Sequence, residues 1–265
     1  MDNQDIEQNN DSNDNNNPEK NEEQLIIERG LQDESEYNRS IKVILLGDSS
    51  VGKSSIIQRV CFKDEIVSPP ATISIENYNY LVKINDYIIR MNIWDTAGQE
   101  KYDSIVKKYY ENADFGIYVY SIDDEKSFER IKTWFSVSND NNNKIDNNGQ
   151  TSILLGNKKD LGENKRKIPF EKGKQLAEEY KFYLFKEISC LDKSEEERKN
   201  IVEIFDVIAI YYYKLHKNRA LTLEDDSIME YEASKSFIEL SKNATVKEKE
   251  GKKEEKKKKM LLKLR

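Results

Sequence analysis

The sequence has few cysteines, one histidine and no long apolar run, and each scarcity excludes a class of protein. Cys61 and Cys190 are too few for a disulfide framework, so both thiols are expected to be free in a reducing, cytosolic setting. His216 is the single histidine, and the chain offers no Ser-His-Asp triad and no His/Cys metal cluster. Because no run of about 20 apolar residues exists, the sequence predicts no transmembrane helix.

Composition indicates that part of the 265-residue chain is not packed. Only 37% of residues are hydrophobic and 35% are charged, against about 45–50% and about 25% in a compact domain. Residues 1–39 are Asn-rich, with 12 acidic and 3 basic side chains and no signal-peptide core. They are expected to be a disordered extension with a short helix around residues 25–31. Residues 218–265 are expected to be a charged tail, and the nearly neutral body between them does not indicate nucleic-acid binding.

Residues 40–217 alternate between buried strands and helices, as expected of one α/β domain. Strands are expected at residues 41–46, 80–84, 89–93, 116–122, 152–155 and 182–188, the second and third joined by a hairpin turn at Asn85-Asp86. Helices are expected at residues 54–60, 125–137, 170–180 and 196–215. The pattern predicts a three-layer fold with a mostly parallel sheet of about six strands. The Asn-rich residues 139–150 are expected to be a loop insertion in solvent.

A phosphate-binding loop follows the first expected strand. Residues 47–54, GDSSVGKS, match G-x-x-x-x-G-K-[ST] between a buried strand and a helix. In this pattern the glycines let backbone N–H groups turn toward phosphate oxygens, and the helix adds its N-terminal dipole. Lys53 is expected to reach the β- and γ-phosphates and the Ser54 hydroxyl to bind Mg²⁺. The loop alone indicates only a nucleotide phosphate, since ATPases, kinases and GTPases share it.

A candidate base-recognition segment follows the fifth expected strand. Residues 157–160 are Asn-Lys-Lys-Asp. A carboxylate at Asp160, buried against the base, can accept hydrogen bonds from N1–H and the 2-amino group of guanine, whereas adenine lacks this donor pair. The Lys158 side chain can cover one face of the base, and Asn157 can link the segment to the phosphate loop. An ordinary surface turn is the alternative, but Glu187-Ile188-Ser189-Cys190, one strand–helix unit later, favours guanine recognition.

The sequence resembles the Ras superfamily of small GTPases on four motif blocks in family order, over about residues 41–215. The strongest of these blocks is Ile93-Trp94-Asp95-Thr96-Ala97-Gly98-Gln99-Glu100, which matches the family's motif residue for residue. Trp94, Ser49, Tyr109-Tyr110 and the spacing from Thr72 to Asp95 are most similar to the Rab branch. The resemblance implies the P-loop NTPase fold of a small G domain, with GTP or GDP and Mg²⁺ bound. The implied nucleotide-binding residues are Gly47, Asp48, Ser49, Ser50, Val51, Gly52, Lys53, Ser54, Ser55, Thr72, Asp95, Gly98, Asn157, Lys158, Asp160, Ser189, Cys190 and Leu191.

The resemblance also implies individual roles outside the phosphate loop. Thr72, which lies 18 residues after the phosphate-loop serine, would bind Mg²⁺ and sense the γ-phosphate, and Asp95 would hold Mg²⁺ through water. The Gly98 N–H would contact the γ-phosphate, and Gln99 would orient the attacking water as the catalytic residue. The Cys190 N–H would take the place of the family's alanine N–H at guanine O6. Hydrolysis would release the segments of Thr72 and Gly98, as in a switch.

Several positions depart from the Rab pattern and bear on activity. Ser50 replaces a phosphate-loop glycine, and Glu65 replaces an aromatic residue that packs beside guanine. Further departures are Ser74 and Asn77, in place of a glycine and a phenylalanine, and Leu191, in place of a lysine. The first two weaken the expectation of hydrolysis and of tight nucleotide retention.

The partners that the resemblance implies are an exchange factor, a GTPase-activating protein and effectors. They would bind a surface formed by residues 72–77, Trp94 and Tyr109. The sequence as given has no cysteine after Cys190, so prenylation is not expected, although most Rabs carry it. The basic residues near the C-terminus can touch an anionic membrane or stay solvated, and interleaved glutamates oppose the first. The expected location is cytoplasmic, with peripheral contact to endomembranes left open.

Three hypotheses for the function stay open. The first is a Rab-like switch in vesicle trafficking or signalling, with turnover on the order of 10⁻⁴–10⁻³ s⁻¹ because no internal arginine finger is evident. The second is a hydrolysis-deficient nucleotide-binding scaffold, favoured by Ser50, Glu65 and the missing lipid site. The third is an ATP-using P-loop enzyme. Gln99 and Thr72 favour the first.

Overall fold

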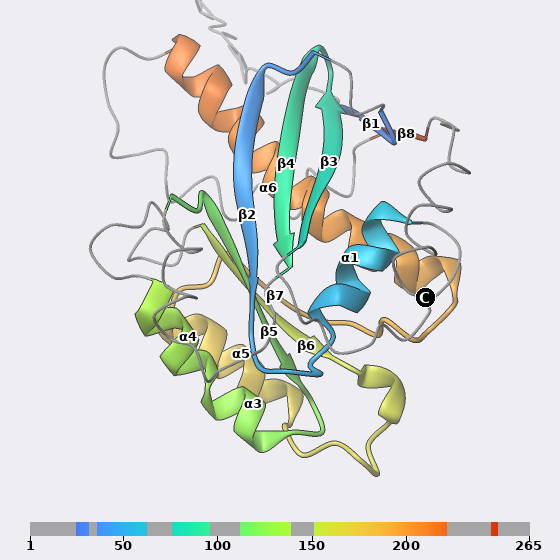
Figure 1. Ribbon diagram of the computed structural model, residues 1–265, viewed down its shortest axis with the longest axis vertical. Helices are drawn as coiled ribbons and strands as arrows, with labels where there is room; N and C mark the ends of the chain where they lie inside the picture. Colours follow the sequence, from blue (N-terminus) through green and yellow to red (C-terminus); the bar gives the residue numbers. More distant parts are fainter. Residues whose placement is uncertain are drawn as a thin grey trace, which may run out of the picture.

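The computed structural model contains one sheet flanked by helices (Figure 1) and describes residues 25–31, 36–62, 76–95, 112–138, 151–221 and 245–248. The sheet has eight strands in the order β7-β6-β5-β2-β4-β3-β1-β8. The strands are β1 (Ile26–Arg29), β2 (Arg39–Leu46), β3 (Glu76–Ile84), β4 (Tyr87–Asp95), β5 (Phe115–Ser121), β6 (Ser152–Asn157), β7 (Leu184–Glu187) and β8 (Thr245–Glu248). All six expected strands are present, at slightly different bounds.

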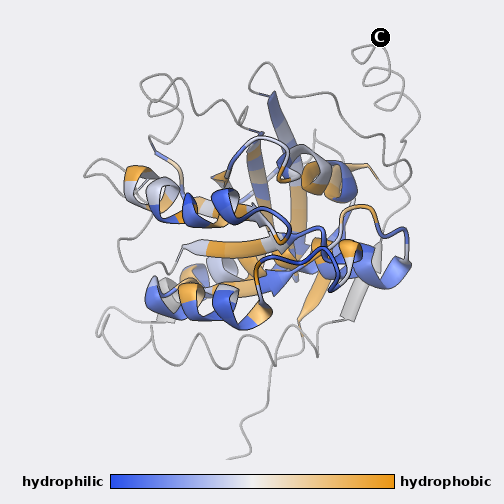
Figure 2. Cartoon of the chain, turned by 90° about the horizontal axis from the view of Figure 1, so that it is seen from below, coloured by the Kyte–Doolittle hydropathy of each residue, from blue (hydrophilic) through white to orange (hydrophobic). Residues whose placement is uncertain are grey.

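The helices form the two outer layers. They are α1 (Lys53–Cys61), α3 (Glu125–Glu129), α4 (Ile131–Ser138), α5 (Phe170–Glu179) and α6 (Glu195–Leu221), with a short 3₁₀ helix, η1 (Lys159–Leu161). Helices α1 and α6 cover one face of the sheet and α3, α4 and α5 the other, and their polar residues lie largely on the outside (Figure 2). The predicted three-layer α/β fold is therefore confirmed. None of the helices within the described ranges is long and apolar enough to cross a membrane.

The pairing of the central strands is mostly parallel, as expected. Strand β2 pairs in parallel with β4 and β5, and the series continues in parallel through β6 to β7. Strands β3 and β4 form the predicted antiparallel hairpin, whose turn at Asn85-Asp86 places Asn85 at φ 52°, a conformation that asparagine tolerates well. Parallel pairing brings the carboxyl ends of β2, β4 and β6 to one edge of the sheet.

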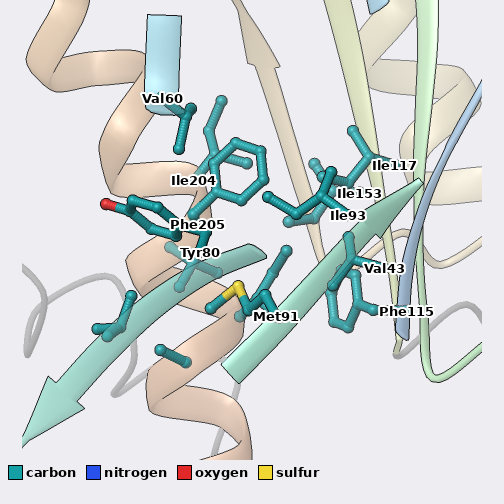
Figure 3. Packing of buried hydrophobic residues seen from close by; sticks show 14 of the residues in the cluster. Val43, Val60, Tyr80, Met91, Ile93, Phe115, Ile117, Ile153, Ile204 and Phe205 are labelled. Carbon is teal, nitrogen blue, oxygen red and sulfur yellow. The ribbon is translucent and has the colours of Figure 1, made fainter. Parts of the chain in front are cut away.

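The core between the sheet and α6 is built from branched and aromatic side chains. Figure 3 shows Val43, Met91 and Ile93 of the sheet facing Ile204 and Phe205 of α6. All five are fully buried. Each buried side chain of this kind stabilises the fold by roughly 1.5–3 kcal/mol. This packing gives the loops at the strand ends a rigid support.

The prediction of a helix around residues 25–31 is wrong, because part of this segment forms strand β1. Leu25, Ile27 and Arg29 are buried in alternation, and Ile27 lies opposite Ile84 of β3 in antiparallel pairing. Two apolar side chains with this period of two fit a sheet edge better than a single helical turn. Arg29 forms a bidentate ion pair with Asp206 of α6.

The sheet therefore has two more strands than the roughly six that were expected. The added strands, β1 and β8, come from the expected extension and tail and pair in parallel with each other. The division of the chain at residues 39 and 217 otherwise stays a prediction.

Candidate functional site

The phosphate loop between β2 and α1 has a backbone that requires glycine at both ends. A Cβ on Gly47 would lie 2.1 Å from the Val119 carbonyl oxygen, and one on Gly52 would lie 2.0 Å from Asn157 Nδ2. Both glycines also have positive φ, 145° and 104°. Ser50 has φ 63°, a conformation that is disfavoured by about 1–2 kcal/mol for a side chain other than glycine. The loop thus keeps the shape that glycine normally permits, at the expense of strain at Ser50.

Lys53 lies across the loop rather than out in solvent. Its side chain comes from the first turn of α1, the residue is 5% exposed, and Nζ donates to the carbonyl oxygens of Gly47 at 2.7 Å and Asp48 at 2.8 Å. A buried ammonium needs such partners because its desolvation is unfavourable. The two carbonyls hold the positive charge over the loop, where a phosphate can meet it.

Ser54 and Asp95 form a pair of oxygen donors beside Lys53. Ser54 Oγ donates a hydrogen bond to Asp95 Oδ2 at 2.6 Å. Asp95, the last residue of β4, is 2% exposed. Mg²⁺ prefers oxygen ligands and often takes only one or two from the protein, with phosphate and water completing its shell. The hydroxyl and carboxylate therefore fit the expected magnesium site.

Asn157 links the base-recognition segment to the phosphate loop, as the sequence suggested. It is the last residue of β6 and is 2% exposed. Its Nδ2 donates to the Val51 carbonyl oxygen at 2.8 Å, and its Oδ1 accepts from the Cys190 N–H at 3.3 Å. One side chain thus joins three separate loops. The Cys190 N–H, which the family resemblance assigns to guanine O6, is directed at Asn157 in this structure.

Lys158 and Asp160 flank the place expected for the base. Lys158 has φ 72°, and its Nζ lies 3.6 Å from Asp123 Oδ1. Although burial raises the pKa of Asp123, a hydrogen bond from Ser121 and the Lys158 charge together hold that pKa below its usual value. Asp160 accepts a hydrogen bond from the Ser189 hydroxyl. Asp160 is exposed. Selectivity for guanine requires a buried carboxylate, so the bound base itself would have to cover Asp160.

Glu197 is a supporting residue that the sequence did not reveal. It lies in the first turn of α6, is 3% exposed, and accepts hydrogen bonds from the Ser189 N–H at 2.7 Å and from Lys159 Nζ. Its own N–H donates to Ser194 Oγ at 3.2 Å. Ser194 and Glu197 have the S-x-x-E spacing of a helix start, which was the available signal. Glu197 therefore joins the two segments expected around the base.

Arg130 and Trp134 are two further contacts that the sequence did not predict. Trp134 Nε1–H donates to Asp48 Oδ1 at 2.9 Å, and Arg130 Nε lies 3.2 Å from the same oxygen. Arg130 lies between α3 and α4 and Trp134 lies on α4, and both come more than 80 residues after Asp48 in the sequence. The second position of the phosphate loop is thereby held from the opposite layer of the fold.

Cys190 and Leu191 differ sharply in exposure. Burial raises the pKa of the Cys190 thiol to about 12, so this thiol stays protonated at neutral pH. Leu191 is 55% exposed. Nothing in the structure explains its place in the motif.

The remaining predicted site residues lie partly outside the described residues. Ser49 and Ser50 are exposed, Val51 is buried, and Ser55 lies on α1. The predictions for Glu65, Thr72, Ser74, Gly98, Gln99 and Tyr109 fall outside the described residues. Of the expected partner-binding surface, Asn77 and Trp94 are opposite each other on β3 and β4. Lys42 Nζ lies 4.9 Å from the centre of the Trp94 ring.

The sheet order and the loop after β2 define an α/β protein of the P-loop NTPase class. A comparison with protein families matches the Ras family over residues 42–213. The Ras-related protein Rab-11B of Dictyostelium discoideum is 36% identical over 189 residues, which cover 71% of this chain and 81% of that protein.

Two further relatives agree. The Ras-related protein RABE1e of Arabidopsis thaliana is 35% identical over 66% of this chain and 76% of its own length. The GTP-binding protein yptV2 of Volvox carteri is 37% identical over 66% and 78%. The chain belongs to the Ras family of small GTPases and is Rab-like within it.

Proposed function

We propose that this protein is a Rab-like switch that binds GTP or GDP with Mg²⁺ and selects guanine through Asp160. The observation that supports the proposal is the pair of hydrogen bonds that the Asn157 side chain makes, one to Val51 of the phosphate loop and one to Cys190. These contacts bring a phosphate-binding loop and the expected guanine-binding segments into one site. A nucleotide spanning them would place its phosphates at Lys53 and its base beside Asp160.

The proposed division of roles follows the Ras-family resemblance. Lys53 neutralises the β- and γ-phosphates, and Ser54 and Asp95 hold Mg²⁺, which supplies charge neutralisation at the phosphates when bound. Thr72 and Gly98 sense the γ-phosphate, and Gln99 orients the attacking water. Slow hydrolysis would then alternate two states.

The proposed partners are an exchange factor, a GTPase-activating protein and effectors in vesicle trafficking or signalling. The GTP-bound state would recruit the effectors through the surface that includes Asn77 and Trp94. The proposed location is cytoplasmic, and the proposal leaves peripheral contact to endomembranes open.

A hydrolysis-deficient scaffold is the second candidate, and Ser50 favours it. Ser50 has a left-handed backbone and is exposed, and it adds a side chain to the phosphate loop where most Rabs have only hydrogen. A serine there can displace the attacking water or hinder an incoming arginine. Nucleotide binding is common to both candidates, so only the rate of hydrolysis separates them.

Analysis of the nucleotide bound to the purified protein tests the proposal. We expect GDP or GTP in wild type, released by denaturation and identified by chromatography. Asp160→Ala should lower GDP affinity by at least about 100-fold, because two hydrogen bonds to a charged acceptor are lost. Glu163→Ala is the matched control, since its carboxylate is 83% exposed in the same loop. Equal affinity of wild type for GDP and ADP would contradict guanine selectivity and support the ATP-using enzyme.

Single-turnover hydrolysis with Ser50→Gly separates switch from scaffold. Preloaded wild type should convert GTP to GDP at a measurable rate, on the order of 10⁻⁴–10⁻³ s⁻¹. Glycine at position 50 should also stabilise the fold by about 1 kcal/mol, because the left-handed strain is relieved. If wild type hydrolyses nothing while Ser50→Gly does, the scaffold is correct.

A further inference from the structure

We propose that Arg130 and Trp134 are positioning residues for the phosphate loop, which act by fixing and neutralising the Asp48 carboxylate. The inference rests on the proposed nucleotide binding and assigns a part in it to the α3–α4 junction. Neither residue is expected to touch the nucleotide.

Two donors converge on one carboxylate oxygen. Trp134 Nε1–H donates to Asp48 Oδ1 at 2.9 Å, and Arg130 Nε lies 3.2 Å from the same atom. The Arg130 guanidinium also lies 5.4 Å from the centre of the Trp134 ring, within the range of a cation–π contact. The three side chains therefore support one another, and movement of Asp48 would break at least two contacts.

The same aspartate also holds the phosphate-binding lysine. The Asp48 carbonyl oxygen accepts from Lys53 Nζ at 2.8 Å. The carboxylate and the backbone carbonyl of Asp48 are separated by only three rotatable bonds, so a fixed carboxylate restricts the orientation of the carbonyl. Arg130 and Trp134 thus act on Lys53 through Asp48.

Charge gives a second reason for the arrangement. The loop has to accept a polyanion, and a carboxylate within it would repel phosphate unless a cation lies beside it. Arg130 supplies that cation. An ion pair that is 34% exposed on the arginine side is weak by itself. Trp134 is 7% exposed, its hydrogen bond to Asp48 is partly buried, and a hydrogen bond to a charged acceptor is among the stronger kinds.

The structural alternative is that Trp134 serves only the core. Its ring belongs to the apolar cluster between the sheet and α3–α5. Trp134→Phe separates the two roles, since phenylalanine keeps most of the apolar ring and loses the N–H donor. Arg130→Gln removes the charge at a partly exposed position, where folding is not at risk.

The test is a double-mutant cycle on the release of fluorescently labelled GDP at constant Mg²⁺. Arg130→Gln and Trp134→Phe should each release GDP about three- to tenfold faster than wild type. In an Asp48→Asn background, Arg130→Gln should change the rate by less than about twofold, because the charge it neutralises is gone. Lys132→Gln is the matched control, since Lys132 lies on α4, pairs with Glu179 and is 55% exposed.

Each outcome has a distinct meaning. Wild-type rates in both single variants, or an equal effect of Arg130→Gln with and without the Asp48 charge, would overturn the positioning role and leave the proposed function intact. If wild type binds GDP and ADP alike, guanine selectivity fails, and the cycle is then measured with ADP because Asp48 acts on the phosphate side. A wild type that binds neither nucleotide overturns both proposals.

Discussion

Replacing Arg29 with methionine should destabilise the domain far more than its position on an edge strand suggests. Arg29 and Asp206 are 7% and 3% exposed and form a bidentate ion pair between β1 and α6. Methionine keeps much of the side-chain volume but leaves the Asp206 carboxylate buried without its cation. Removing one partner of a buried pair typically lowers the free energy of unfolding by about 3–5 kcal/mol.

Urea unfolding followed by far-UV circular dichroism measures this change. In thermal unfolding, the same loss of stability in a domain of 150–250 residues would lower Tm by about 6–20 °C. Glu28→Gln is a control on the same strand, because Glu28 lies 3.7 Å from a partly exposed Lys83. Glu28→Gln should lower the free energy of unfolding by less than about 1 kcal/mol.

The double variant Arg29→Met/Asp206→Leu distinguishes a lost ion pair from a lost strand. With both charges replaced by apolar side chains, most of the stability should return, since a buried pair is often no better than a hydrophobic substitute. The reasoning is refuted if Arg29→Met unfolds at the wild-type urea concentration, or if the double variant is no more stable than the single one.

Two other perturbations follow from the site. Gly52→Ala should abolish nucleotide binding in equilibrium titration, because its Cβ would meet Asn157 Nδ2 at 2.0 Å. Gly162→Ala is the control: a Cβ there meets no atom within 4 Å, so this variant should keep binding and lose about 1–3 kcal/mol of stability to its backbone conformation, φ 70° and ψ 175°. Alkylation of Cys190, measured by mass spectrometry, should stay slower than that of the less buried Cys61 up to about pH 9, because burial raises the pKa of the Cys190 thiol to about 12. The same raised pKa makes stability depend on pH. The Cys190 thiol stabilises the fold at pH values below the pKa that it has in the unfolded chain, and this contribution is lost as the pH rises toward 12. Fast native-state alkylation of Cys190 would contradict the burial argument.

Local patterns made much of the fold predictable. The hairpin turn at Asn85-Asp86 and the glycines of the phosphate loop are encoded by neighbouring residues whose backbone preferences are strong. Asn157 was expected to link its segment to the phosphate loop, and it does so at Val51. The contact is possible because the carboxyl ends of parallel strands lie at one edge of the sheet.

Contacts between distant segments could not be predicted in the same way. The Asp48–Trp134 hydrogen bond joins residues 86 positions apart, and Arg29–Asp206 joins residues 177 apart. Nothing local marks either pair, because Trp134 follows an ordinary helical pattern and Arg29 ends a stretch too short to identify its partner. The roles expected for Thr72 and Gln99 stay predictions, since both fall outside the described residues.

The place of β1 bears on the order in which this chain can be assembled during synthesis. Residues 26–29 leave the ribosome before both of their partners, because β3 begins 50 residues after β1 and Asp206 lies 177 residues after Arg29. Contacts between residues so far apart in the sequence form slowly, because a long loop has to close first. We therefore expect β1, the first strand of the described sheet, to dock late, and β8, which pairs only with β1 in that sheet, to dock after it.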